Sequence, residues 1–239
     1  MPSISFKDLI RFIKDPYASD FDYNSYPVKQ KSVLFVKLFF FSLIITYSAS
    51  IFISIEKSIL TQFGIEIKNL SIKAAEGNYT ELLMIIFFIP LLEEIIFRLS
   101  LSFRKRDITI VYFVLLGVVI INLNIFDTDI MRRLVSFSLL FLSALAFYFW
   151  DKIKEDSLKK IKTNYGKYIV WVSIVLFACA HISNIANFDL KLLPIYLINV
   201  SPMFLFAIFA TFCRLKLGFL YGVLLHIGTN ILPALSSQF

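Results

Sequence analysis

The stretch LLEEIIFRLS (91–100) places two adjacent glutamates and one arginine inside an otherwise apolar run. A charged side chain at the centre of a bilayer costs at least about 2.5 kcal/mol on insertion scales, so three charges together need a reason. The rest of the chain is apolar too, because 58% of its 239 residues are hydrophobic and only 17% are charged. One soluble core does not need so much apolar surface. The composition therefore predicts an integral membrane protein.

Apolar segments follow one another along most of the chain, and most are long enough to cross a hydrocarbon core of about 30 Å. They lie at 33–55, 81–103, 108–126, 134–150, 167–184, 192–213 and 217–234. The segment at 134–150 is short, so we expect about seven membrane helices, within a range of six to eight. The predicted fold class is an all-α, polytopic bundle of transmembrane helices.

The N-terminal segment is polar and mixed in charge. Four apolar residues of SFKDLIRFIK (5–14) recur at helical spacing: Phe6, Leu9, Ile10 and Ile13. This pattern predicts an amphipathic helix at the cytoplasmic membrane interface, with a disordered tail as the alternative. We therefore expect a cytoplasmic arm over 1–32 and a single integral membrane domain over 33–239.

The net charge of +7 comes from Lys and Arg in short connectors between apolar segments. This distribution indicates membrane topology rather than nucleic-acid binding, so we expect no nucleic-acid partner. Connectors rich in Lys and Arg alternate with poorer ones, which predicts a multi-pass protein with its N-terminus in the cytoplasm. The connectors expected inside are 104–107, 151–167 and 214–216, and those expected outside are 56–81, 127–133 and 187–191.

The charges of the opening stretch differ in their local partners. Glu94 and Arg98 are four residues apart, so on a helix they can pair on one face. Glu93 points about 100° away from Glu94 and has no such partner. Pro90 has no N–H for the helical hydrogen bond and predicts a local kink beside Glu93. The pair is typical of a structural strut, which leaves Glu93 as the candidate functional carboxylate.

Both histidines of the chain, His181 and His226, fall in predicted membrane segments. Asn230 follows His226 by four residues, on the same helical face. Gly222 and Gly218 precede His226 by four and eight residues, on the same predicted helical face. Because glycines have no side chain, they would leave space on the helix surface beside His226 and Asn230. Such glycines fit either helix packing or access for an extended peptide.

Depth in the membrane relates four of these polar groups. Along their helices, Glu93, His181, His226 and Asn230 lie about 15–21 Å from the cytoplasmic charges, at nearly one level. Intramembrane ionisable groups are costly and usually functional, which favours a shared site. A lone histidine satisfied within a core is the alternative for each imidazole.

Three short motifs occur in order on separate segments. EEIIFR (93–98) fits EExxxR, FACAH (177–181) fits FxxxH and HIGTN (226–230) fits HxxxN. In this the chain resembles the CPBP family of CAAX proteases and bacteriocin-processing enzymes, which includes the type II CAAX prenyl endopeptidase. The resemblance covers about residues 80–234, the expected protease-like core.

The resemblance implies catalytic roles for four residues. Glu93 and His181 would hold and activate a water, while His226 and Asn230 would stabilise the oxyanion of the tetrahedral intermediate. Three further motif residues would support the site: Glu94, Arg98 and Phe177. The family was earlier grouped with metalloproteases, but the resemblance favours a glutamate-dependent mechanism without a metal cofactor. Zinc held by Glu93, His181 and His226 is the alternative, although the chain has no HExxH motif.

We therefore expect an intramembrane endopeptidase that hydrolyses a membrane-associated peptide or protein, with membrane lipid as its other partner. The composition, rich in Lys, Ile and Asn, resembles that of a low-GC bacterium, so the expected location is the bacterial plasma membrane. Two hypotheses from other classes stay open. One is a non-catalytic bacteriocin-immunity or partner-binding protein, and the other is a proton- or cation-coupled carrier.

Overall fold

The structure, a computed structural model, describes residues 6–17, 26–65, 79–122, 142–144, 146–150, 152–185 and 189–236. Within these ranges the chain forms helices and no strand. In chain order they are α1 (Phe6–Lys14), α2 (Val28–Gln62), α3 (Tyr79–Leu83), the π-helix η3 (Met84–Phe88), α4 (Ile89–Arg98), η4 (Leu99–Ser102), α5 (Lys105–Asn122), α7 (Glu155–Ala180), η5 (His181–Asn184), η6 (Leu190–Leu192), α8 (Leu193–Asn199), α9 (Ser201–Lys216) and α10 (Phe219–Ser236). The all-α prediction is confirmed for this part of the chain.

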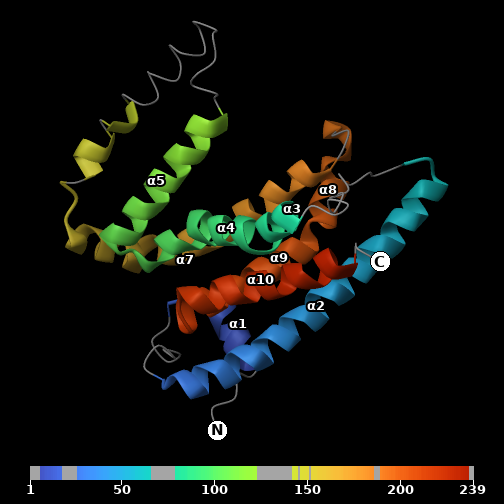
Figure 1. Cartoon of the computed structure of the whole chain (residues 1–239), viewed down its shortest axis with the longest axis horizontal. Helices are drawn as coiled ribbons and strands as arrows, with labels where there is room; N and C mark the ends of the chain where they lie inside the picture. Colours follow the sequence, from blue (N-terminus) through green and yellow to red (C-terminus); the bar gives the residue numbers. More distant parts are fainter. Residues whose placement is uncertain are drawn as a thin grey trace, which may run out of the picture.

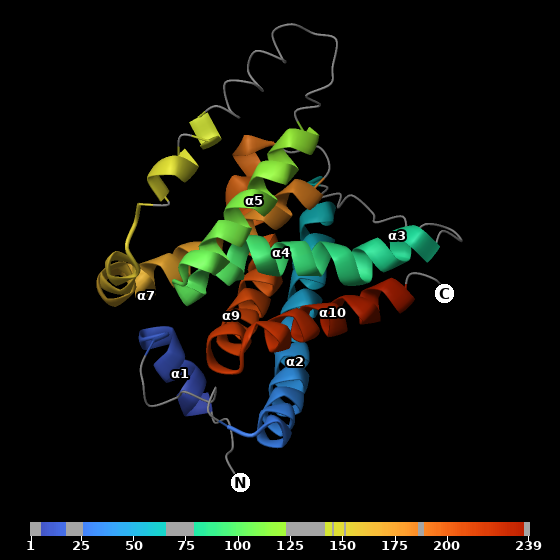
Figure 2. The same cartoon turned by 60° about the vertical axis from the view of Figure 1, so that its left-hand side comes forward.

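Helix α9 lies at the centre of the packing. It contacts α2, α7 and α10, and every side chain from Phe206 to Cys213 is buried. A helix that is apolar on all sides is stable only when neighbours surround it, which accounts for this position. Helices α4 and α10 lie side by side across the middle of the molecule (Figures 1 and 2). This arrangement brings the predicted EExxxR and HxxxN segments next to each other.

Two helices in the described residues are long and apolar enough to cross a membrane, α2 and the run Glu155–Asn184. A third crossing results if Leu190–Asn199 and Ser201–Lys216, which meet at 48°, form one bent span. Helices also occupy the other four predicted apolar segments wholly or in part, but a seven-span bundle is not established. Most of the segment predicted at 134–150 lies outside the described residues.

The bend before α9 and the turn after it have local causes. Pro202 stands in the first turn of α9, where it has no N–H to continue a helix from α8. At the other end, Leu217 and Gly218 both donate backbone N–H groups to the Cys213 carbonyl. Gly218 has a φ of 121°, which favours glycine. Gly218 therefore lies in the turn before α10, and its predicted place on a ridge of that helix is wrong.

The expected membrane helix at 81–103 is divided into four short elements, α3, η3, α4 and η4. The π-helix immediately precedes Pro90. Within it, the N–H of Ile89 donates to the carbonyl of Met84, five residues back. The widened turn immediately precedes α4, and single π turns of this kind are frequent at functional sites.

The amphipathic helix predicted in the N-terminal arm is present as α1. Its residues Leu9 and Phe12 are buried, and the Phe12 ring lies 5.2 Å from that of Phe212, edge to face. The arm continues to Tyr17, whose hydroxyl donates to the Leu101 carbonyl at 2.8 Å. Part of the apolar face that we expected at a membrane interface therefore packs against α9.

Candidate functional site

A buried ion pair lies on α4, as the spacing of Glu94 and Arg98 predicts. The Nη1 of Arg98 donates to Oε1 of Glu94, and both side chains are almost fully buried. Arg98 also donates from Nε to Oγ1 of Thr211 on α9, at 3.2 Å. Its guanidinium carbon lies 4.2 Å from the centre of the Phe177 ring. Hydrogen bonds and ring stacking together hold this cation in the interior.

His226 on α10 lies between the two glutamates of α4. Its Nδ1 is 3.0 Å from Oε1 of Glu94, and its Nε2 is 3.4 Å from Oε2 of Glu93. The Glu94 side chain has no exposed surface, whereas that of Glu93 is 27% exposed. The two carboxylates therefore differ in access: Glu94 is enclosed by protein, and Glu93 is the one that water or substrate can reach.

The positions of both ring nitrogens constrain the protons of this group. A neutral imidazole carries one N–H and one lone pair, and ionised carboxylates only accept hydrogen bonds. When ionised carboxylates face both ring nitrogens, each nitrogen must carry a hydrogen for its contact to be favourable. A neutral imidazole carries only one, so the group needs one more proton. An imidazolium at His226, or a protonated carboxyl beside it, meets this requirement. The cluster of Glu93, Glu94, Arg98 and His226 then has no net charge, which suits its burial.

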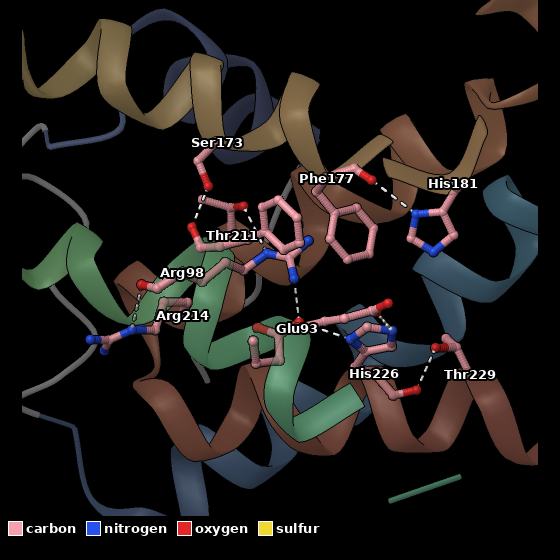
Figure 3. A network of polar contacts seen from close by, with 11 residues as sticks. Glu93, Arg98, Ser173, Phe177, His181, Thr211, Arg214, His226 and Thr229 are labelled. Atoms are coloured by element: carbon pink, nitrogen blue, oxygen red, sulfur yellow. Dashed lines mark hydrogen bonds and ion pairs between the residues drawn. The ribbon is translucent and has the colours of Figure 1, made fainter. Parts of the chain in front are cut away.

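Phe177 and His181 bring α7 to the same place. The Phe177 ring centre lies 4.7 Å from that of His181 and 5.7 Å from that of His226. Nδ1 of His181 is 2.9 Å from the Phe177 carbonyl, which only accepts, so this nitrogen carries the hydrogen. In the neutral ring, Nε2 is then a hydrogen-bond acceptor. The His181 ring lies on the side of Phe177 that faces Glu93 and His226 (Figure 3).

Asn230 lies one helical turn beyond His226 and contacts the π-helix. Ile89 donates to Met84 rather than to Ile85, and Pro90 has no N–H, so the Ile85 carbonyl lacks its usual helical donors. The Asn230 amide donates to this carbonyl at 3.3 Å.

Gly222 gives α4 room to approach α10. A Cβ at this position would lie 3.2 Å from Oε2 of Glu94 and 3.5 Å from the carbonyl of Ala210. A side chain would therefore press on the buried carboxylate and on α9 at once. Of the two interpretations of this glycine, helix packing is the one that the contacts support.

Sequence reasoning missed three contributors to the site. Thr211 bonds Arg98, Phe206 places its ring centre 4.8 Å from that of His226, and Ser173 donates to the Phe97 carbonyl. Thr211 is a polar residue within the apolar run FAIFATFC, and that placement was a usable signal. The other two give no such signal, because a phenylalanine and a serine are common in membrane helices.

The alternative zinc set of Glu93, His181 and His226 does not form a ligand group in the described residues. None of their His, Cys, Asp or Glu side chains gather in threes with geometry suited to a metal ion. Both nitrogens of His226 already face carboxylates, and Nδ1 of His181 is taken by the Phe177 carbonyl. A metal would have to replace these contacts, so the arrangement of these residues does not fit a metal ion.

Comparisons of the chain with known protein families, characterised proteins and solved structures found no match. The resemblance to the CPBP family therefore rests on the three motifs at 93–98, 177–181 and 226–230. In space, residues of all three motifs are joined by direct contacts around Phe177 and His226.

Proposed function

We propose that this protein is an intramembrane endopeptidase of the CPBP type, which hydrolyses a peptide bond in a membrane-associated peptide or protein. One observation carries the proposal: His226 contacts both Glu93 and Glu94, Phe177 packs against His226, and His181 packs against Phe177. Residues from three distant segments thus gather around His226, beside a carboxylate with access to the outside. A purely structural ion pair does not need the second glutamate or either histidine.

Glu93 is the proposed general base. It is the accessible carboxylate of the pair, and His181 presents a ring nitrogen toward the same side (Figure 3). A water held between Glu93 and His181 would lose a proton to Glu93 as its oxygen attacks the carbonyl carbon of the peptide bond. Glu93 would then deliver that proton to the leaving nitrogen when the C–N bond breaks. The products are a carboxylic acid and an amine, without a covalent enzyme intermediate.

His226 is the proposed donor to the developing oxyanion. Glu94 accepts from Nδ1 and fixes the ring, so that Nε2 carries the additional proton of the group. That nitrogen lies 3.4 Å from Oε2 of Glu93 at rest, and its N–H would donate to the oxyanion during attack. Asn230 uses one amide hydrogen on Ile85, and its second amide hydrogen is available in the same role.

The protein in this proposal is multi-pass and lies in the bacterial plasma membrane with its N-terminus in the cytoplasm. The spans α2, Glu155–Asn184 and the bent pair α8 and α9 support a membrane location. Shorter apolar helices, including Phe219–Ile231, would complete the bundle of about seven. Lipid and a membrane-bound substrate are its proposed partners.

A proton-coupled carrier is the second candidate, because the proton shared among Glu93, His226 and Glu94 also suits a relay. It predicts gradient-dependent uptake into proteoliposomes that Glu93→Gln abolishes. A carrier would leave the peptide termini of the membrane fraction unchanged. Non-catalytic immunity or partner binding predicts that Glu93→Gln changes neither uptake nor termini.

The test compares cells that express wild type, Glu93→Gln or Glu56→Gln at matched membrane levels. Glu56, on α2, is a partly buried glutamate outside the site and undergoes the same chemical change. Peptide termini in the membrane fraction are enriched and quantified by mass spectrometry, with and without a metal chelator. We expect a set of termini to fall about 100-fold or more with Glu93→Gln alone and to be insensitive to the chelator. Termini that do not depend on Glu93 would overturn the proposal.

A further inference from the structure

A cavity lies away from the Glu93 and His226 cluster. Its volume is about 850 Å³, within the range of small-molecule sites. Its walls come from the end of the N-terminal arm, the last turn of α4, the start of α5, helix α7 and the turn between α9 and α10. None of Glu93, His181 and His226 lines it. Arg214 lines it and lies on the far side of Arg98 from His226 (Figure 3).

The cavity is strongly basic. Five lining residues carry positive charge: Arg104, Arg106, Lys162, Arg214 and Lys216. Asp107 is the one acidic side chain among the lining residues, and both of its oxygens are engaged. Nε of Arg106 lies 3.3 Å from one oxygen, and Nη2 of Arg214 lies 3.7 Å from the other. The lining therefore has an excess of four positive charges.

Two of these cations are partly withdrawn from solvent. Lys216 is only 5% exposed, and the Arg214 side chain is 12% exposed. Arg214 is oriented by hydrogen bonds to the carbonyls of Arg98 and Leu99, at 3.3 Å each. Five cations against one carboxylate leave a net positive charge around one cavity, which a bound anion would offset. Lys and Arg residues that set the orientation of a membrane protein act equally well from exposed connectors. Membrane topology therefore does not require these cations to gather around one cavity.

Part of the wall is apolar. It contains side chains from α4, η4, α5, α9 and the start of α10: Ile95, Leu99, Ile110, Leu215 and Phe219. A ligand that fits both the charged and the apolar parts of the lining has an anionic head and an apolar body. Arginine forks match phosphate oxygens in pairs, and basic pockets on the cytoplasmic side of membrane helices suit phospholipid headgroups.

We propose that this cavity binds the phosphate group of an anionic phospholipid, with the start of its acyl chains against the apolar wall. A soluble phosphate ester shares the headgroup chemistry but leaves the apolar wall uncovered. The assignment does not depend on the proposed peptidase activity, because no residue of that site takes part.

Tyr17 forms a fixed part of the wall. Its hydroxyl donates to Leu101, and the Lys162 ammonium lies 4.8 Å from its ring centre. A Cβ at Gly166 would lie 2.8 Å from the Tyr17 ring, so this glycine allows the ring to seat against α7. Burial raises the pKa of Tyr17 above its ordinary value although Arg214 acts in the opposite direction, so the phenol stays a donor. The N-terminal arm thus closes one side of a preformed cavity.

The test measures thermal unfolding of the purified protein in a neutral detergent with three additives. They are short-chain phosphatidylglycerol, phosphatidylcholine of the same chain length and glycerol phosphate. The double variant Arg104→Gln/Lys162→Gln removes two cavity charges. Lys154→Gln/Lys160→Gln is the matched control, because these exposed lysines lie outside the cavity.

We expect phosphatidylglycerol to raise the unfolding midpoint of wild type and of the control by about 2 °C or more above the phosphatidylcholine value. The cavity variant should lose at least half of this shift. An equal shift from glycerol phosphate would identify a soluble phosphate ester as the ligand and contradict the lipid assignment. A shift that is absent, or equal in the cavity variant and the control, would overturn the proposed site.

Discussion

Nδ1 of His226 lies 3.0 Å from Oε1 of Glu94, a carboxylate with no exposed surface. The same oxygen accepts from Arg98, so one atom joins the last helix of the chain to the ion pair of α4. This contact determines which nitrogen of His226 points to Glu93. The two neighbouring glutamates consequently have different tasks, one inside the packing and one at its edge.

Substitutions of the two glutamates should therefore change the free energy of unfolding by different amounts. Glu94→Gln leaves the buried guanidinium of Arg98 without its counter-charge, and we expect a loss of about 3–5 kcal/mol in the free energy of unfolding. Glu93→Gln changes a partly exposed side chain and should cost less than about 1 kcal/mol. Denaturant or thermal unfolding of the purified variants measures both values. An equal or larger loss in Glu93→Gln would contradict the assigned roles.

Gly222→Ala tests the close approach of α4 to α10. The added methyl group meets Oε2 of Glu94 at 3.2 Å, and we expect a loss of about 1–3 kcal/mol from overpacking. Gly117→Ala is the control, since a Cβ there meets nothing within 4 Å and helix propensity favours alanine by up to about 1 kcal/mol. If both variants unfold at the same temperature as wild type, the described helix contact is wrong.

A double-mutant cycle tests the bond from Asn230 to the π-helix. Asn230→Ala removes the donor to the Ile85 carbonyl and should cost about 1 kcal/mol. Pro90→Ala restores a backbone N–H in the same turn, so the Asn230 substitution should cost less in that background. The expected coupling is about 0.5–1 kcal/mol, measured from the four unfolding free energies. Strictly additive effects would show that the two residues act independently.

The stability that the N-terminal arm contributes should depend on pH through the titration of Tyr17. Its folded-state pKa is raised by burial above the unfolded value of about 10. The stabilisation it contributes is therefore complete below about pH 10 and is lost as the pH rises through the raised folded-state pKa. Comparing the unfolding midpoints of wild type and Tyr17→Phe removes the titration of other groups. Their difference should be constant up to about pH 10 and shrink above it; a constant difference at higher pH would argue against a buried phenol.

The part of the site that the sequence predicted is the part encoded by local spacing. Glu94 and Arg98 pair because four residues make one helical turn, and Glu93 is left accessible for the same reason. A shared level in the membrane predicted that Glu93, His181 and His226 lie together; Glu93 contacts His226, and His181 is joined to them through Phe177. Contacts between distant helices follow no such rule, so the bonds of Arg98 to Thr211 and of Asn230 to Ile85 emerged only in three dimensions.

The same distinction between local spacing and tertiary contacts applies to the fold. Long apolar runs predicted the apolar parts of α2 and α7, because hydrophobic length needs no tertiary information, but both helices extend into stretches that were predicted as connectors, 56–81 and 151–167. The division of 81–103 into short helical elements depends on the backbone conformation around Pro90. The position of α1 depends on the apolar surface of α9 against which it packs. Periodicity marks the apolar face of α1 but does not distinguish protein from lipid as the surface that covers it.

The central claim is that Glu93 carries out peptide hydrolysis. Its most direct test incubates purified, reconstituted wild type and Glu93→Gln with the same detergent-extracted membrane proteins and quantifies new peptide termini over time. Wild type should generate discrete termini, and the rate should fall about 100-fold or more in Glu93→Gln while its unfolding midpoint stays near that of wild type. Termini that form equally with both proteins, or with neither, would contradict the claim.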